Sequence, residues 1–425
     1  MRSGPVLRRI CLAQTSLRAM ITRSSQRLGE ALDASRPAQH RPTILEEMMN
    51  PFLDYLTTHA DDMLNDLKAL VEHQSPTQDK ALVDACGAFL SELFARHLHV
   101  RPERFAQTQV GDHLLFKIGQ GDRRSLLLTH FDTVWDLDRL GTRIEDGKYY
   151  GPGAFDMKGG VIQGLWALKA LIAAKALDNH EVWFLCTSDE ETGSWHSRAL
   201  IEETARQCDQ VLVLEPSEEG TGNLKIARKG TGQFQMLIKG KAAHAGNNPL
   251  GGISAAEEMA RQILRLHALQ DLSKGTTVNV GIAQAGNRIN VIPDHASLSI
   301  DVRVSSLDEA ERVEAEIRTC PVFLDGAQIE VSGGLNRPPM EVNARNKALF
   351  EQATRAGIAL GMTVSGSAVG GGSDGNFTSA LAIATLDGLG AEGGGPHAEY
   401  EHVTIAGLPR RAALISQIIA NVNAG

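Results

Sequence analysis

Histidine and acidic side chains stand where apolar segments of this sequence end, or in glycine-rich loops. They are His130, Asp132, Asp156, Glu190, Glu191, Glu215 and His397. Imidazole and carboxylate ligands without a thiolate suit a pair of divalent ions, most often zinc. Two such ions can hold a water between them and activate it as a nucleophile. The set therefore predicts a metal-dependent hydrolase.

The order of these residues suggests how two ions would be shared. Asp156 lies in GPGAFDMKGG, between a glycine-rich turn and a predicted helix start, where the backbone has unusual freedom. It is the candidate for the carboxylate that bridges both ions. We expect His130 and Glu215 to complete one site. Glu191 and His397 would complete the other.

Two acids remain outside the predicted ligand set. Asp132 follows His130 by two residues, and a carboxylate at that spacing can orient the imidazole ring. Glu190 is left without a metal. A free carboxylate beside an activated water is the expected general base, and it can later protonate the departing nitrogen.

Each motif alone is weak. An isolated HxD occurs often by chance, DEE is commonly a solvated acidic patch, and a histidine in a glycine-rich loop is ordinarily just exposed. The prediction depends on the joint pattern, in which separate segments each supply a residue suited to the same metal pair.

The elements that must position these residues alternate between strands and helices. Apolar runs predict buried strands at 125–130, 181–188 and 210–215, and helical periodicity predicts helices at 159–177 and 196–206. This alternation predicts an α/β fold whose mostly parallel sheet is flanked by helices. In such sheets ligands collect at the carboxyl ends of the strands.

The pattern changes near residue 230. Alternating polar and apolar residues predict antiparallel strands, with helices at 253–269 and 307–318, which gives a β-α-β-β-α-β block. His397 and a helix at 407–423 follow this block, so the first domain must be discontinuous. The expected parts are an N-terminal extension (1–47), the first part of a catalytic domain (48–229), an inserted domain (230–337) and the second catalytic part (338–425).

Composition excludes several classes of protein. A net charge of −9 argues against a general nucleic-acid binder. No stretch reaches the roughly 18 to 20 apolar residues that span a bilayer. Five scattered cysteines, with no CxxC, suit a reducing compartment. We expect a cytoplasmic protein, because the arginine- and serine-rich residues 1–47 contain no clear signal peptide for periplasmic export. These residues are expected to be disordered or not native; their composition also resembles an organellar transit peptide.

Several motifs together resemble the M20 family of metallopeptidases, and most of all its glutamate carboxypeptidase (carboxypeptidase G2) branch. They are HFDTV, GPGAFDMKGG, DEE, LEPS, IKGKAAHAGNNPLGGISA, AGNRINVIP, DVRV, NRPPM and GGGSD. The resemblance covers nearly the whole chain from about residue 50. One departure is Met157, where that branch often has a second Asp after the bridging acid. Another is the missing export signal.

The resemblance implies a zinc-exopeptidase type catalytic domain with an inserted ferredoxin-like domain that acts as lid and dimerisation surface. It implies two Zn²⁺ ions, with Co²⁺ or Mn²⁺ as substitutes in vitro. His244 matches a histidine that reaches the partner subunit's site and stabilises the oxyanion. Asn290 and Arg337 match positions that hold the substrate's carboxylate, and Gly371 and Gly372 are expected to face the substrate.

Three functions stay open from the sequence. The leading one is removal of a C-terminal amino acid, with glutamate as a candidate, from an N-acyl amino acid or short peptide. The second is an aminoacylase or deacetylase acting on N-acyl amino acids. The third is a non-catalytic metal- or ligand-binding protein, which Glu190 disfavours because a binder needs no free base. Nucleotide binding is weaker still, since the glycine-rich loops lack the P-loop Lys-Ser/Thr.

Overall fold

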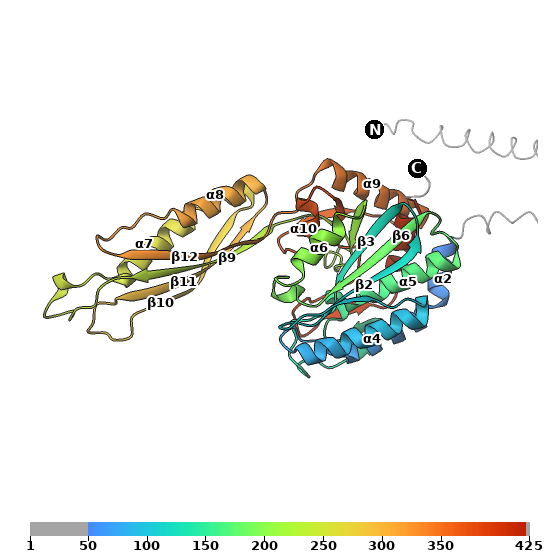
Figure 1. Cartoon of the computed structure of the whole chain (residues 1–425), viewed down its shortest axis with the longest axis horizontal. Helices are drawn as coiled ribbons and strands as arrows, with labels where there is room; N and C mark the ends of the chain where they lie inside the picture. Colours follow the sequence, from blue (N-terminus) through green and yellow to red (C-terminus); the bar gives the residue numbers. More distant parts are fainter. Residues whose placement is uncertain (1–49, 422–425) are drawn as a thin grey trace, which may run out of the picture. The chain divides into compact units, whose positions relative to one another are not determined.

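A computed structural model describes residues 50–421 of the chain, and the prediction for residues 1–47 lies outside this range. Its central feature is a six-stranded sheet in the order β1-β2-β6-β3-β7-β14 (Figure 1). Strands β6, β3, β7 and β14 run parallel, whereas β1 and β2 are antiparallel to their neighbours. The strands span Glu103–Phe105 (β1), His113–Gln120 (β2), Arg123–His130 (β3), His180–Thr187 (β6), Gln210–Val213 (β7) and Ala384–Leu386 (β14).

Helices cover both faces of this sheet, because its central strands are apolar on both sides. On β3, Leu127 joins one buried cluster, while Leu126 and Leu128 join another. The first cluster is closed by α2–α5, α9 and α11, and the second by α6 and α10. The helices span Pro51–Thr58 (α2), Ala60–Glu72 (α3), Lys80–Leu98 (α4), Gly159–Ala173 (α5), Arg198–Ala205 (α6), Ala344–Ala359 (α9), Gly375–Ala380 (α10) and Gly407–Asn421 (α11). The predicted α/β class is confirmed.

Two small sheets complete this part of the molecule. Strands β15, β16, β5 and β4 form an antiparallel sheet, in which His402 of β16 pairs with Tyr150 of β5. The parallel pair β8 and β13 forms the other. These strands span Arg143–Glu145 (β4), Lys148–Tyr150 (β5), Leu224–Arg228 (β8), Gly366–Val369 (β13), Gly393–Gly394 (β15) and His402–Thr404 (β16). The β5–β16 pairing brings segments about 250 residues apart side by side.

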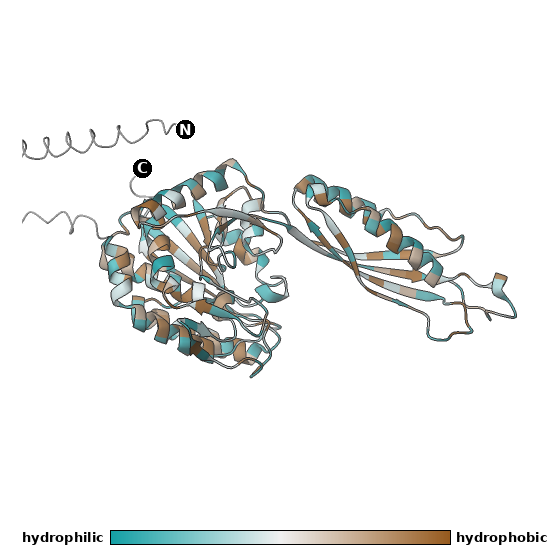
Figure 2. Cartoon of the chain, turned by 180° about the vertical axis from the view of Figure 1, so that it is seen from behind, coloured by the Kyte–Doolittle hydropathy of each residue, from teal (hydrophilic) through white to brown (hydrophobic). Residues whose placement is uncertain are grey.

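A second, four-stranded antiparallel sheet has the order β10-β11-β9-β12 and carries two helices. Phe234, Met236 and Ile238 alternate into its core, while the intervening Gln235 and Leu237 are exposed. Its helices accordingly bury one stripe and expose the other, as the brown and teal banding of Figure 2 indicates. Its elements are Gly230–Lys239 (β9), Ala255–Ala268 (α7), Thr277–Ala285 (β10), His295–Val304 (β11), Leu307–Arg318 (α8) and Gln328–Arg337 (β12).

The chain enters and leaves the four-stranded sheet through neighbouring strands. Arg337 at the end of β12 is in register with Thr231 near the start of β9. Just beyond them, the backbones of Arg228 and Met340 exchange hydrogen bonds in both directions. The last residue of the inserted block is therefore held close to the first.

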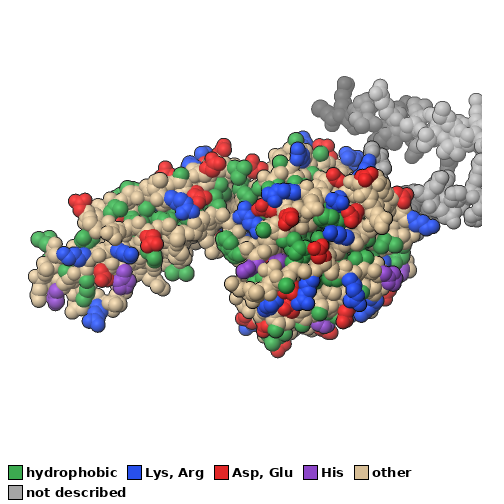
Figure 3. Space-filling model, viewed as in Figure 1, with side chains coloured by type: hydrophobic (Ala, Val, Ile, Leu, Met, Phe, Trp, Pro, Cys, Tyr) green, Lys and Arg blue, Asp and Glu red, His purple; other side chains and the backbone are tan. Residues whose placement is uncertain are grey.

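Charged side chains of both signs lie on the surface of the molecule (Figure 3). On the face seen in Figure 3, basic and acidic side chains are interspersed and no broad basic patch forms there. Within residues 50–421, no helix combines the length and apolarity needed to cross a bilayer.

Candidate metal centre

The carboxyl ends of three adjacent parallel strands bring four of the predicted site residues together. His130 is the last residue of β3, paired with Thr187 at the end of β6. Glu190 and Glu191 open a single 3₁₀ turn just after β6, and Glu215 follows β7. Since β6, β3 and β7 are neighbours, these side chains meet at one edge of the sheet.

Asp156 and His397 reach this edge from the small antiparallel sheet. Asp156 follows β5 in a short irregular helical turn (Ala154–Lys158), and His397 lies between β15 and β16. Gly153 precedes the turn with φ +71°, and a Cβ there would lie 2.5 Å from Thr133 Cγ2. Glycine is required at this position because both the backbone angle and the space exclude a side chain. The Asp156–Met157 peptide bond is cis.

The two oxygens of Asp156 each face a different histidine. Oδ1 lies 3.4 Å from His130 Nε2, and Oδ2 lies 3.4 Å from His397 Nε2. Glu215 Oε1 is 3.4 Å from the same nitrogen of His130, and Glu191 Oε2 is 3.2 Å from that of His397. The side chains thus form two sets that share one carboxylate.

These separations fit ligands of common ions better than they fit hydrogen bonds. Charged N–H···O bonds are typically about 2.7–2.9 Å long. Tetrahedral ligands at about 2.0–2.1 Å from one zinc ion are about 3.3–3.4 Å apart. Within the described part of the chain, the buried atoms His130 Nε2 and Glu191 Oε1 also have no hydrogen-bond partner. A divalent ion in each set would satisfy these polar atoms, so the ligand atoms fit a dinuclear centre.

Asp132 contacts three of the predicted site residues, His130, Glu190 and Glu191. The Nδ1 atom of His130 lies 3.1 Å from the Asp132 carbonyl oxygen and 3.4 Å from its Oδ1 atom. Because both neighbours are acceptors, Nδ1 carries the hydrogen and Nε2 presents its lone pair to the metal position. The Asp132 carboxylate also accepts the backbone N–H groups of Glu190 and Glu191. The buried side chain of Asp132 therefore orients one imidazole and both glutamates.

Acidic side chains outnumber the histidines in this site. The neighbouring carboxylates of Asp156 and Glu191 raise the pKa of His397 to about 11. Burial opposes protonation of His130, but Asp132, Asp156 and Glu215 outweigh it and raise its pKa. Burial, with the nearby charge of Asp156, raises the pKa of Glu191 to about 7. Bound cations would replace these protons, as expected for a metal site.

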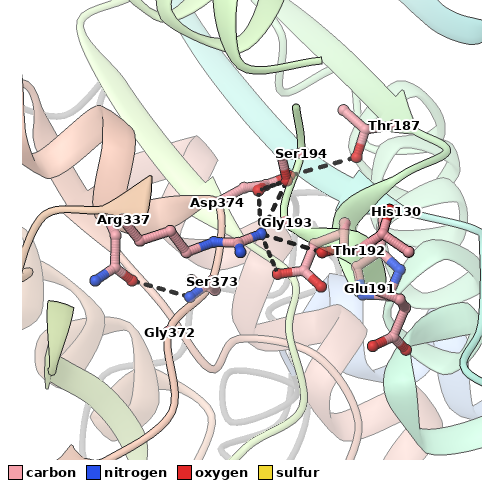
Figure 4. A network of polar contacts seen from close by, with 12 residues as sticks. His130, Thr187, Glu191, Thr192, Gly193, Ser194, Arg337, Gly372, Ser373 and Asp374 are labelled. Carbon is pink, nitrogen blue, oxygen red and sulfur yellow. Dashed lines mark hydrogen bonds and ion pairs between the residues drawn. The ribbon is translucent and has the colours of Figure 1, made fainter. Parts of the chain in front are cut away.

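Glu190 is held next to the constellation by Arg337. The Nη2 atom of Arg337 donates to Glu190 Oε1 (2.8 Å), to Asp374 Oδ1 (3.0 Å) and to Ser194 Oγ (2.8 Å) (Figure 4). Burial raises the pKa of Glu190 well above its usual range despite the opposing charge of Arg337. Among residues 50–421, the buried Nε atom of Arg337 has no hydrogen-bond partner. Arg337 thus retains an unpaired donor on the same guanidinium that contacts Glu190.

The backbone carbonyl groups of Gly371 and Gly372 are bound by the guanidinium of Arg228. Their carbonyl oxygens accept hydrogen bonds from Nη1 of the buried Arg228 at 3.2 and 3.3 Å. Arg228 also forms a bidentate ion pair with Asp387 and lies 3.8 Å from Glu215. The carbonyl oxygens of both glycines are therefore engaged by the protein.

His244 and Asn290, predicted to act on substrate, lie together in the four-stranded domain. His244 forms an isolated antiparallel β-bridge with Val291, and the backbone N–H of Ala245 donates to the Asn290 carbonyl. Both side chains are exposed. The His244 ring accepts from the N–H groups of Gly246 and Asn247 in its own loop. The described residues give neither residue a hydrogen bond to the metal constellation of its own chain.

Sequence reasoning missed two residues of this site. Asp374 lies in the noted GGGSD motif, but its pairing with Arg337 and Ser194 was not predicted. Arg228, in LKIARKG, was not singled out at all. Both are charged and nearly fully buried, which requires partners, yet burial of polar residues is not visible in a single sequence.

Comparisons with known proteins place the chain among metallopeptidases. Residues 126–421 match the family described as Peptidase family M20/M25/M40. Carboxypeptidase G2 from Pseudomonas sp. (strain RS-16) is 32% identical over 92% of this chain and 100% of its own length. Succinyl-diaminopimelate desuccinylase from Magnetococcus marinus is 26% identical over 75% of this chain and 88% of its own.

The fold is shared with solved structures. Aminopeptidase PepT from Bacillus cereus superimposes with a TM-score of 0.71 at 23% identity, covering 86% of this chain and 99% of its own. The family match spans well over half of the chain, and the sequence prediction of an M20-like hydrolase is confirmed. This chain belongs to peptidase family M20/M25/M40 and is a metal-dependent hydrolase.

Proposed function

We propose that this enzyme holds two zinc ions and cleaves the amide bond to a C-terminal amino acid with a free carboxylate, with glutamate as the preferred residue. The observation that carries the proposal is the pair of ligand sets joined by Asp156, with Glu190 beside them. His130, Asp156 and Glu215 would hold one ion, and Asp156, Glu191 and His397 the other. When bound, the ions supply a nucleophilic water at neutral pH and polarise the scissile carbonyl.

Glu190 would act as the general base. Its raised pKa suits a group that takes a proton from water and then delivers it to the leaving nitrogen. Asp132 fixes the backbone of Glu190 through a 3.3 Å hydrogen bond. This contact limits the motion of the carboxylate during the two proton transfers.

Arg337 would recognise the free carboxylate of the substrate. A guanidinium matches a carboxylate geometrically, and the Nε donor of Arg337 has no partner among the residues that the structure describes. Asp374 would keep the guanidinium in place from the far side. Because Arg337 also contacts Glu190, a bound carboxylate would compete for the same guanidinium and loosen its hold on the base.

A hydrolysis panel tests this proposal directly. N-acyl amino acids with one fixed acyl group and Glu, Asp, Ala, Leu, Phe or Arg as the amino acid would be incubated with zinc-loaded protein, with and without a chelator. We expect chelator-sensitive cleavage with the highest kcat/KM for Glu. Absence of cleavage with both metals bound would contradict catalysis and favour a binding protein.

An aminoacylase or deacylase function is the second candidate. It is favoured by the similarity to succinyl-diaminopimelate desuccinylase, whose name describes removal of an acyl group. Both reactions cleave an amide near a carboxylate, so the catalytic residues are common to them. In the same panel, chelator-sensitive cleavage with a preference for apolar or basic amino acids would support this candidate over the glutamate carboxypeptidase.

We propose further that residues 230–337 act as a lid and form a homodimer in which His244 and Asn290 serve the partner's site. Their pairing and exposure support donation of hydrogen bonds to an oxyanion outside their own chain. Mixing equal amounts of inactive Glu190→Ala and His244→Ala proteins should then restore about a quarter of wild-type activity, because random exchange makes half of the dimers mixed and each mixed dimer holds one intact site of two. Verified subunit exchange without recovered activity would contradict a shared site.

A further inference from the structure

We propose that Glu401 is a positioning residue that fixes the two metal-ligand loops against each other. This inference rests on the proposed dinuclear centre and assigns a role outside its ligand set. Glu401 lies four residues after His397 and is almost completely buried. Burial of a carboxylate is costly unless donors surround it, and the donors around Glu401 come from the Asp156 loop.

Both oxygens of Glu401 accept hydrogen bonds from that loop. Oε1 accepts the backbone N–H groups of Phe155 (2.9 Å) and Asp156 (3.0 Å). Oε2 accepts the N–H of Gly153 (3.1 Å) and the indole N–H of Trp135. The Glu401 side chain therefore accepts hydrogen bonds from three backbone donors of one loop, those of Gly153, Phe155 and Asp156. A buried backbone donor left without a partner costs about 1–3 kcal/mol.

The same residue is anchored in the His397 loop. The N–H of Glu401 donates to the Ala398 carbonyl at 2.8 Å, and that of Ala398 donates to Gly395. The Glu401 carbonyl in turn accepts the N–H of Gly151. Glu401 thus joins the turn that carries His397 to the turn that carries Asp156, through both its side chain and its backbone.

These contacts of Glu401 affect the distance between Asp156 and His397. Asp156 Oδ2 and His397 Nε2 lie 3.4 Å apart although their residues are 241 positions apart in the chain, Asp156 to His397. Metal affinity depends steeply on such spacing, and residues that orient ligands typically change affinity about 10- to 100-fold when replaced. We therefore assign to Glu401 the alignment of the ion held by Asp156, Glu191 and His397.

The test compares Glu401→Gln with Glu399→Gln in the full chain. A glutamine amide nitrogen cannot accept the two hydrogen bonds that one carboxylate oxygen now accepts. Glu399 is a matched control, because it is close in sequence, 71% exposed and paired with Arg139 at the surface. Metal-free proteins would be titrated with Co²⁺ against a competing chelator, following the visible absorption of each bound equivalent, with thermal unfolding measured in parallel.

In Glu401→Gln we expect one Co²⁺ equivalent to bind about 10- to 100-fold more weakly with an altered absorption band. The other equivalent, which shares only Asp156 with the affected loops, should weaken less, and all properties of Glu399→Gln should stay close to wild type. Two equivalents bound as in the control would overturn the inference, as would equal weakening of both in a variant that unfolds at the wild-type temperature. If Glu401→Gln does not fold, Glu401→Asp, which is one methylene shorter, takes its place with the same criteria. Failure of wild type itself to bind two equivalents would refute the proposed centre, and this role with it.

Discussion

Replacement of Glu190 by glutamine should lower kcat by about 10²- to 10⁴-fold, the usual contribution of a general base. Both metals should stay bound. The substitution keeps the size of the side chain and its contact with Arg337 but removes the proton acceptor. It leaves the two ligand sets around Asp156 intact. Steady-state kinetics and metal content per chain, measured on the same preparation, check both parts of this expectation.

Glu191→Gln is the matched control for that experiment. Glu191 is adjacent in sequence and similarly buried, but its carboxylate lies 3.2 Å from His397 Nε2. We expect this variant to lose affinity for one metal, with activity falling as a consequence. If Glu190→Gln lost a metal and Glu191→Gln kept both, the roles assigned to the two glutamates would have to be exchanged.

Replacement of Asp156 by asparagine should have an equally large effect by a different route. Its two oxygens face two histidines, and asparagine offers only one neutral oxygen. We expect binding of both ions to weaken and hydrolysis to fall to background, because each ion loses a charged ligand. Metal content after dialysis and the hydrolysis rate at saturating zinc measure this.

The variant His397→Ala tests whether Asp156 bridges the two ions, because its result can be compared with that of Asp156→Asn. This side chain lies near Asp156 and Glu191 but faces only one of the two ligand sets. We expect it to lose one ion and retain the other. If Asp156→Asn and His397→Ala each lost a single ion, Asp156 would not bridge the two ions.

Part of the site could be predicted because it follows from sheet geometry. His130 is the last residue of a strand, and Glu190 and Glu215 follow within three residues of the end of theirs; the apolar runs of these strands are visible in the sequence. The carboxyl ends of adjacent parallel strands lie at one edge, so these residues had to meet there. The α/β class and the helices flanking the sheet were readable for the same reason, since periodicity is a local property.

The roles of residues that depend on burial and long-range pairing could not be predicted from the sequence. Glu401 lies in a stretch that was noted only for His397, and its hydrogen bonds reach residues 245 or more positions away. Asp374 likewise meets Arg337 only because α10 and the end of β12 converge. Nothing in the local sequence distinguishes these acids from exposed ones.

Arg337 illustrates the boundary most clearly. The NRPPM motif pointed to an arginine suited to bind a carboxylate, but its contact with Glu190 spans 147 positions of sequence. The sequence by itself determined which chemical groups are present and which strand ends deliver several of them. Only the tertiary structure decided that Asp156 faces both histidines and that Arg337 holds the base, because such contacts depend on how separate sheets pack and not on local spacing.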